Sequence, residues 1–182
     1  VVLIECMGHN EAADQEAFSG LLERALEDGL LVDAVVASSA KQADDIWRVR
    51  EGSEILIREM GPFVSFDISV DIRRADEFVA TVNAALATTF GAYRAVAFGH
   101  LGDGNIHVGV HTGADTLAHK HAIERCVYDV VKRFGGALTA EHGIGTAKRE
   151  FLPEHVTPAA LATMRNVRQA LDPERLINRN VL

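Results

Sequence analysis

The chain has 182 residues, of which 48% are hydrophobic and 24% are charged, and its formal net charge is −8. This composition is typical of a globular domain with one core, and the acidic balance argues against nucleic acid and anionic membrane surfaces as partners. No apolar run approaches the ~20 residues that a membrane-spanning helix needs, so no transmembrane segment is expected.

Apolar spacing predicts strands and helices in a mixed order. Strands are expected at residues 1–5, 30–37, 63–71, 95–98 and 106–110. Helices are expected at residues 14–28, 41–59, 74–90, 115–134 and 158–171. This order lacks a regular parallel β-α-β alternation. It therefore predicts an α+β sandwich in which helices cover one face of an antiparallel sheet.

Two features of the sequence bear on the cellular location of the protein and on whether the chain is part of a longer polypeptide. Its two cysteines, Cys6 and Cys126, show no metal-type spacing and are predicted to be buried free thiols. Free thiols fit a reducing compartment, and a cytoplasmic location is expected. The sequence begins inside a predicted strand and without methionine, from which we expect a piece of a longer protein.

Two histidines bracket a glycine-rich turn between the last two predicted strands. Asp103-Gly104 is typical of a two-residue hairpin loop of type I′. When the chain folds back there, His100 and His107 come to lie at the facing ends of paired strands. Two converging imidazoles indicate a metal site or a proton-handling site. The alternative is a plain turn with two partly exposed histidines.

A second cluster favours a metal site or a proton-handling site over a plain turn. Residues 139–145 offer Glu141 and His142 in another glycine-containing loop. Two histidines and one carboxylate, here His100, His107 and Glu141, form a known catalytic ligand set for zinc and similar divalent ions. His142 remains beside such an ion as an acid or base, able to accept the proton of a substrate hydroxyl.

The same residues leave other functions open. A metal-dependent hydrolase would use this ligand set to activate a water molecule. A non-catalytic metal-binding module is a third interpretation. The sequence contains no Gly-x-Gly-x-x-Gly fingerprint after a strand, no Walker loop and no nucleophile elbow.

The two histidine motifs resemble the signatures of a known family. The segments at residues 99–107 and 140–145 are similar to those of the C-terminal domain of FAD-linked oxidases, which include flavin-dependent D-lactate, glycolate and D-2-hydroxyglutarate dehydrogenases. Residues 47–51, 66–69 and 171–173 match in the same order. The resemblance therefore covers almost the whole chain, and the D-2-hydroxyglutarate branch is the most similar.

The resemblance implies a fold, a reaction and partners. The fold would be ferredoxin-like, and residues 1–182 would form the substrate- and metal-binding domain of a longer polypeptide that also carries an FAD-binding domain. The whole enzyme would oxidise a small 2-hydroxy acid to a 2-oxo acid by hydride transfer to FAD and then pass electrons to an acceptor of unknown identity. This fragment alone would be inactive. A homodimer is a further possibility.

The resemblance also implies roles for single residues. His100, His107 and Glu141 would ligate a divalent metal, typically zinc, and His142 would be the acid/base. Arg50 would bind a substrate carboxylate.

Three positions depart from the D-2-hydroxyglutarate pattern. Glu54, Ser65 and Gly109 stand where that branch carries a threonine, a lysine and an asparagine that contact the substrate. An acidic Glu54 disfavours a second carboxylate nearby. Poor turnover of dicarboxylic substrates is therefore expected.

Overall fold

The computed structural model describes residues 1–181, without the side chains of Ser53, Glu54, Leu56 and Ile57. The departure at Glu54 thus lies outside the described side chains. The chain divides into two compact units, Val1–Leu56 and Ile57–Leu182, and each is described by itself. Among the described residues, no helix combines the length and the apolar character needed to cross a membrane.

The first unit contains helices α1 (Glu11–Glu27) and α2 (Ala40–Glu51). The Ser39 hydroxyl caps α2 by accepting a hydrogen bond from the backbone N–H of Gln42, as serine does at a helix N-terminus. The predicted helix 41–59 is two helices, because α2 ends at Glu51 with Gly52 as its C-cap, and α3 (Ser53–Met60) begins directly after Gly52. The prediction of a helix at 14–28 is confirmed by α1.

The two strands predicted in this unit do not form. Residues 1–5 and 30–37 have no regular secondary structure, and most of their apolar side chains, among them Val1, Val2 and Val32, are exposed. Cys6 is exposed as well, so the prediction of a buried thiol is wrong for it. A strand needs a hydrogen-bonded neighbour, and no described residue pairs with these two segments.

The second unit is built around one antiparallel sheet. Among the described residues it contains β1 (Val64–Ser69), β2 (Arg94–His100) and β3 (Asn105–His111), in the order β1-β3-β2. Helix α4 (Ala75–Phe90) connects β1 to β2 after the short helix η1 (Ile72–Arg74), and α5 (Lys120–Arg133) follows β3. After α5, Ala137 forms a single antiparallel bridge to Ser69 at the outer edge of β1. This is the β-α-β-β-α-β order of a ferredoxin-like fold, with the last strand reduced to one bridge.

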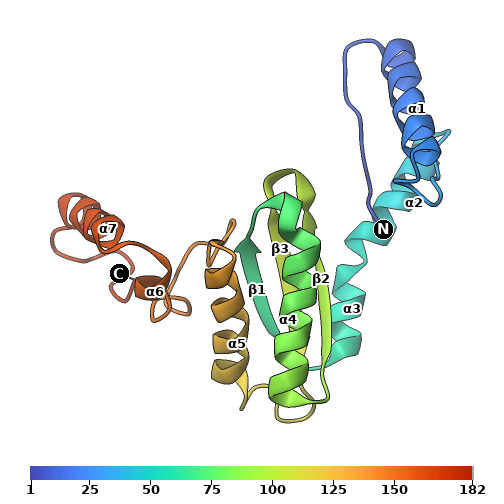
Figure 1. Ribbon diagram of the computed structural model, residues 1–182. Coiled ribbons are helices and arrows are strands. Elements are labelled where there is room, and N and C mark those ends of the chain that lie inside the picture. The colour runs from blue at the N-terminus through green and yellow to red at the C-terminus, as the bar shows by residue number, and fades with distance from the viewer. Residues whose placement is uncertain (182) are drawn as a thin grey trace. The chain divides into compact units, whose positions relative to one another are not determined.

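Helices α4 and α5 pack against one face of this sheet (Figure 1). Core residues recur about every three to four positions along both helices and every second position along the strands. They include Phe66, Ile68, Phe78, Val82, Leu86, Val108, Val110, Val127 and Val131. The predicted α+β sandwich with a helix-covered antiparallel sheet is confirmed. Two further helices, α6 (Leu152–His155) and α7 (Pro158–Leu171), follow, and α7 has the bounds that the sequence predicts.

The helix predicted at 115–134 begins five residues later than expected. Thr116 is fully buried, and its hydroxyl donates to the carbonyl oxygen of Gly113 at 2.6 Å and accepts from the N–H of Thr112 at 2.9 Å. Residues 114–119 therefore form turns, because a side chain satisfies the backbone groups there in place of helical bonds.

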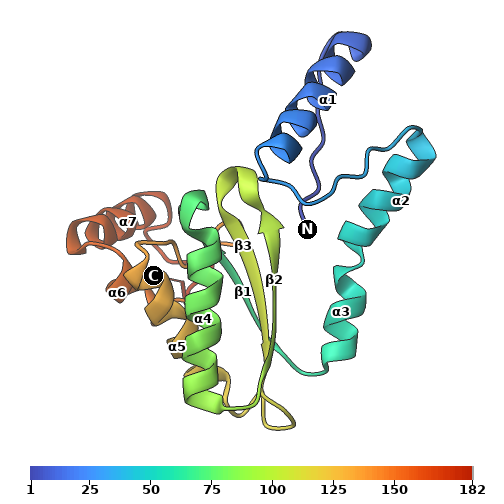
Figure 2. The same ribbon diagram turned by 45° about the vertical axis from the view of Figure 1, so that its right-hand side comes forward.

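The loop between β2 and β3 also differs from the expected type I′ turn (Figure 2). Residues Leu101–Asp103 form the short helix η2, and Gly104 follows in the left-handed conformation with φ +70°. Asp103 does not adopt the positive φ that a type I′ turn requires. Its carboxylate accepts a hydrogen bond from the N–H of Asn105 at 3.0 Å, which stabilises the longer loop.

Replacement of Gly104 by alanine tests this loop. An added Cβ would meet the carbonyl oxygen of Val70 at 2.2 Å, in a backbone conformation that already favours glycine. Gly91 is a matched control, because it has φ +68° and nothing within 4 Å of the added carbon. We expect Gly91→Ala to cost about 1 kcal/mol of unfolding free energy and Gly104→Ala about 2 kcal/mol more, measured by urea unfolding. Equal losses would contradict the close approach of Val70.

Candidate functional site

The face of the sheet opposite α4 and α5 carries the polar residues. Cross-strand partners share a face, and His107 in β3 lies opposite Asp67 in β1 and Phe98 in β2. The rings of Phe98 and His107 are 5.4 Å apart. His100 lies opposite Asn105, two positions along each strand, so the register places His100 and His107 on the same face, as predicted.

A buried carboxylate connects this face to the loop that follows the Ala137 bridge. Asp67 is 4% exposed. Its Oδ2 accepts hydrogen bonds from the Thr139 hydroxyl at 2.7 Å and from the N–H of His142 at 2.9 Å. The N–H of Glu141 lies 3.3 Å from both carboxylate oxygens. Asp67 thus fixes the backbone that carries Glu141 and His142.

Lys148 completes the shell around this carboxylate. Its ammonium donates to Asp67 Oδ2 at 3.3 Å and to the Asp67 backbone carbonyl oxygen at 3.2 Å. Burial raises the pKa of Asp67, but the hydrogen bonds from His142, Thr139 and Glu141, together with the charge of Lys148, outweigh it and hold that pKa well below its usual range. Burial lowers the pKa of Lys148, and the nearby Asp67 only partly opposes this.

Glu141 lies between two imidazoles. Its Oε1 is 3.4 Å from His107 Nε2 and 3.4 Å from His142 Nε2. The two histidine rings are 6.0 Å apart, and His142 Nδ1 is 3.9 Å from Asp67 Oδ2. The side chain of His107 is mostly buried, whereas those of Glu141 and His142 are open to solvent on one side. The arrangement combines a carboxylate with two imidazoles that a small molecule can reach.

Three of the predicted site residues thus come together: His107, Glu141 and His142. His100 stands on the same face, but the compact group of possible ligand atoms found on this face, all within 4.8 Å of one another, consists of Asp67, His107 and Glu141. A second such group among the described residues consists of His121, Glu124 and Glu150. Arg50 lies in α2 and belongs to the other unit. The roles of all five predicted site residues, His100, His107, Glu141, His142 and Arg50, remain predictions.

Asp67 is the residue whose importance the sequence analysis missed. The available signal was an aspartate in the middle of a strand, alternating with Ser65 and Ser69 on the polar face. Although its carboxylate lies near His107 and Glu141, its oxygens already accept hydrogen bonds from three residues and from Lys148. We therefore assign it a positioning role. An imidazole nitrogen and a carboxylate oxygen facing each other, as in His107 and Glu141, suit a divalent ion such as zinc.

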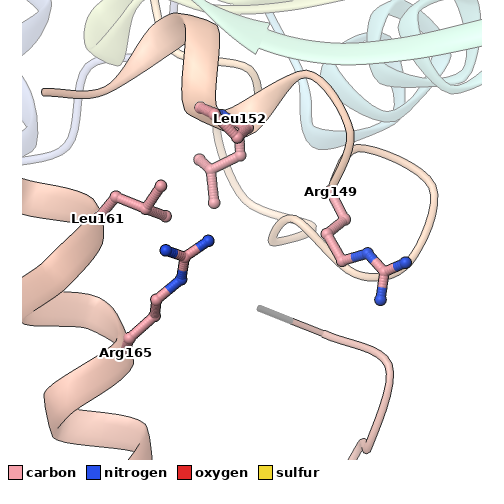
Figure 3. A pocket seen from close by; sticks show the side chains of 5 residues that line it. Arg149, Leu152, Leu161 and Arg165 are labelled. Atoms are coloured by element: carbon pink, nitrogen blue, oxygen red, sulfur yellow. The ribbon is translucent and has the colours of Figure 1, made fainter. Parts of the chain in front are cut away.

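A separate hollow of about 280 Å³ lies around α6 and α7 (Figure 3). Leu152, Pro153 and Leu161 line it together with two arginines, Arg149 and Arg165. In Figure 3 the Arg165 guanidinium extends between Leu161 and Leu152. None of the residues around Asp67 lines it, so it is not part of the polar cluster.

Comparison with known proteins agrees with the sequence motifs. Residues 1–182 match the family described as FAD linked oxidases, C-terminal domain. The chain belongs to this family. The FAD-oxidase C-terminal domain described here carries its polar cluster on the sheet face left uncovered by α4 and α5.

The chain is also similar to curated D-2-hydroxyglutarate dehydrogenases. It is 30% identical over 177 residues to the mitochondrial protein of Arabidopsis thaliana, covering 97% of this chain and 31% of that protein. It is 32% identical to the Xanthomonas citri pv. viticola protein over 182 residues, 97% of this chain and 38% of the relative. The Bos taurus mitochondrial protein is 32% identical over 177 residues, with 97% and 32% covered. The chain thus spans about a third of the length of these relatives.

Replacement of Asp67 tests whether its hydrogen bonds, here called the Asp67 clamp, hold the loop at residues 139–142 on the sheet. Asp67→Ala removes the acceptor for the loop N–H groups and leaves the Lys148 ammonium, whose side chain is 12% exposed, without its counter-charge. We expect a loss of about 3 kcal/mol in unfolding free energy, measured by urea unfolding. Asp129→Ala, at a half-exposed position on α5, is the control and should change the stability by ~0.5 kcal/mol or less. Similar losses for both variants would contradict the clamp.

Proposed function

We propose that this domain is the substrate- and metal-binding part of a flavin-dependent dehydrogenase that oxidises a small 2-hydroxy acid to a 2-oxo acid. The observation that carries the proposal is the placement of Glu141 between His107 and His142 on the open face of the sheet. Membership of the FAD-oxidase C-terminal family, and relatives named D-2-hydroxyglutarate dehydrogenases, support it. They also disfavour the alternative of a metal-dependent hydrolase.

His142 is the proposed general base. Its imidazole is largely exposed, so a substrate hydroxyl can approach it, and its backbone N–H is held by Asp67. Its Nε2 lies 3.4 Å from Glu141 Oε1, so the base stands directly beside the proposed metal ligand. In the oxidation, the hydroxyl proton moves to His142 and the hydrogen on the same carbon leaves with its electron pair as hydride, so that the C–O bond becomes a carbonyl. FAD, bound mainly outside this chain, supplies the hydride acceptor.

His107 and Glu141 are the proposed metal ligands within the cluster, with His100 as the predicted third. A divalent ion bound there, zinc by the chemistry of the donors, would polarise the substrate oxygen as a Lewis acid. Asp67 and the neighbouring hydrogen bonds orient the Glu141 loop, as residues behind a ligand set commonly do.

Arg50 is the proposed partner of the substrate carboxylate, because a guanidinium binds a carboxylate through two parallel hydrogen bonds. It lies in the last turn of α2. The cytoplasmic location, the transfer of electrons to an acceptor of unknown identity and a homodimer also remain predictions. The names of several relatives place those proteins in mitochondria.

The metal ligands can be tested by elemental analysis. We expect the purified full-length protein to contain about one divalent ion per chain, because one ligand set is proposed. His107→Ala and His100→Ala should each reduce that content sharply. His119→Ala, which removes a histidine that contacts Phe90 and Thr112 outside the cluster, is the control and should retain the metal. Wild-type metal content in both cluster variants would show that the ligand assignment is wrong.

The general base can be tested in the full-length enzyme. His142→Ala should keep its flavin and its metal but lose ~10²–10⁴-fold in kcat, the usual contribution of a general base. His142→Gln should do little better, because an amide does not accept the proton. His119→Ala again serves as the control and should keep its activity. Near-normal flavin reduction by His142→Ala in a stopped-flow experiment would contradict the proposal.

A further inference from the structure

The open face of the sheet continues beyond the polar cluster. Two positions after His107 along β3 stands Gly109, which pairs with Ser65 of β1 and with Val96 of β2. Because residues two positions apart on a strand share a face, these three residues lie on the same face as His107. They are called the outer row here. The outer row lies outside the two histidine motifs that carry the family resemblance.

The loop with the proposed base leads toward the outer row. After its bridge to Ser69 the chain runs antiparallel to β1, and the Thr139 hydroxyl then bonds Asp67, two positions further along that strand. The residues that follow therefore continue in the direction of Ser65. A substrate that gives its proton to His142 has the outer row on one side.

Apolar side chains close over the outer row. Gly109 is buried. A carbon added to it would lie 3.2 Å from a methyl carbon of Val96, 3.5 Å from the Phe63 ring and 3.8 Å from the Met60 methyl carbon. Met60 is 6% exposed, whereas Val96 and Phe63 are half-buried and keep part of their surface accessible. The absence of a side chain at Gly109 thus lets Met60, Phe63 and Val96 meet and form one apolar wall.

The apolar wall has no charge to offer a substrate. Ser65 is the one polar side chain of the outer row, and it is exposed. Arg94 stands two positions before Val96 on the same face, but its guanidinium donates to the backbone carbonyl oxygen of Met60 at 2.6 Å. A carboxylate placed against the wall would lose hydration without gaining an opposite charge, whereas a hydrocarbon group is stabilised by burial there.

We propose that the apolar wall contacts the side chain of the substrate, so that the domain prefers 2-hydroxy acids with an apolar side chain over those with a second carboxylate. Val96 is the specificity-determining residue, because it belongs both to the outer row and to the wall. This inference rests on the proposed oxidation of 2-hydroxy acids. It adds the class of side chain that the site takes, which differs from the dicarboxylic acid in the names of the relatives.

The experiment compares two acids of similar shape by their kcat/KM on the full-length enzyme. D-2-Hydroxyisocaproate carries CH₂CH(CH₃)₂, and D-malate carries CH₂COO⁻, so the two side chains differ mainly in charge. We expect D-2-hydroxyisocaproate to be preferred at least tenfold, which corresponds to partial burial of its branched end against the wall. D-Lactate, whose side chain is a methyl group, reports the oxidation without a test of the wall.

Substitution of Val96 separates recognition from structure. Val96→Lys places an ammonium group in the wall, so the preference for D-2-hydroxyisocaproate should fall at least tenfold as malate gains an opposite charge. Ala97→Lys is the matched control, because Ala97 is exposed, follows directly in β2 and belongs to the other face. It should keep the preference. Val96→Thr preserves the shape and adds a hydroxyl, and it should lower the preference about threefold even if the lysine variant does not fold.

The outcomes separate this inference from the proposed function. Equal kcat/KM for the two acids, a preference for malate, or an unchanged preference in the folded Val96 variants would overturn the role of the wall. Oxidation of D-lactate in any of these cases would leave the proposed function standing. Failure to oxidise all three acids would overturn the proposed function, and this inference with it.

Discussion

The site depends on one buried carboxylate. Asp67 stands in the middle of β1, where its side chain is almost inaccessible to water, and ionisation there is costly unless hydrogen bonds compensate. The compensation comes from the loop at residues 139–142 and from Lys148. Because a buried charge does not tolerate the loss of these partners, the loop has little freedom to leave the sheet. Glu141 and His142 are therefore held in place through their backbone, and their side chains stay available for chemistry.

One face of the sheet carries the hydrophobic core, and the opposite face carries the polar cluster. One face packs Phe66, Ile68 and Val108 against α4 and α5. The other carries Asp67 and His107 side by side. Since successive residues of a strand point to opposite faces, a shift of the register by one residue would bury the polar side chains in the core. The hydrophobic core thus fixes the register, and the register fixes the distance between Asp67 and His107.

The loop between β2 and β3 shows how local chemistry adjusts this arrangement. The sequence indicates a tight turn at Asp103-Gly104, but the Asp103 carboxylate binds the N–H of Asn105 and supports a longer loop. This starts β3 at Asn105, which pairs with His100 of β2 and with Ser69 of β1. The Asp103 side chain therefore helps to set where β3 begins.

The sequence by itself determined the α+β class, the helices α1, α4 and α7, and the two histidine motifs, because these follow from local periodicity and from residue types at fixed spacing. It also led to His107, Glu141 and His142. It did not determine whether residues 1–5 and 30–37 form strands, since a strand exists only when another segment supplies hydrogen-bond partners. Only the tertiary structure revealed the Asp67 clamp and the apolar wall at Gly109. Both depend on contacts between segments that are far apart in sequence and whose burial no local pattern encodes.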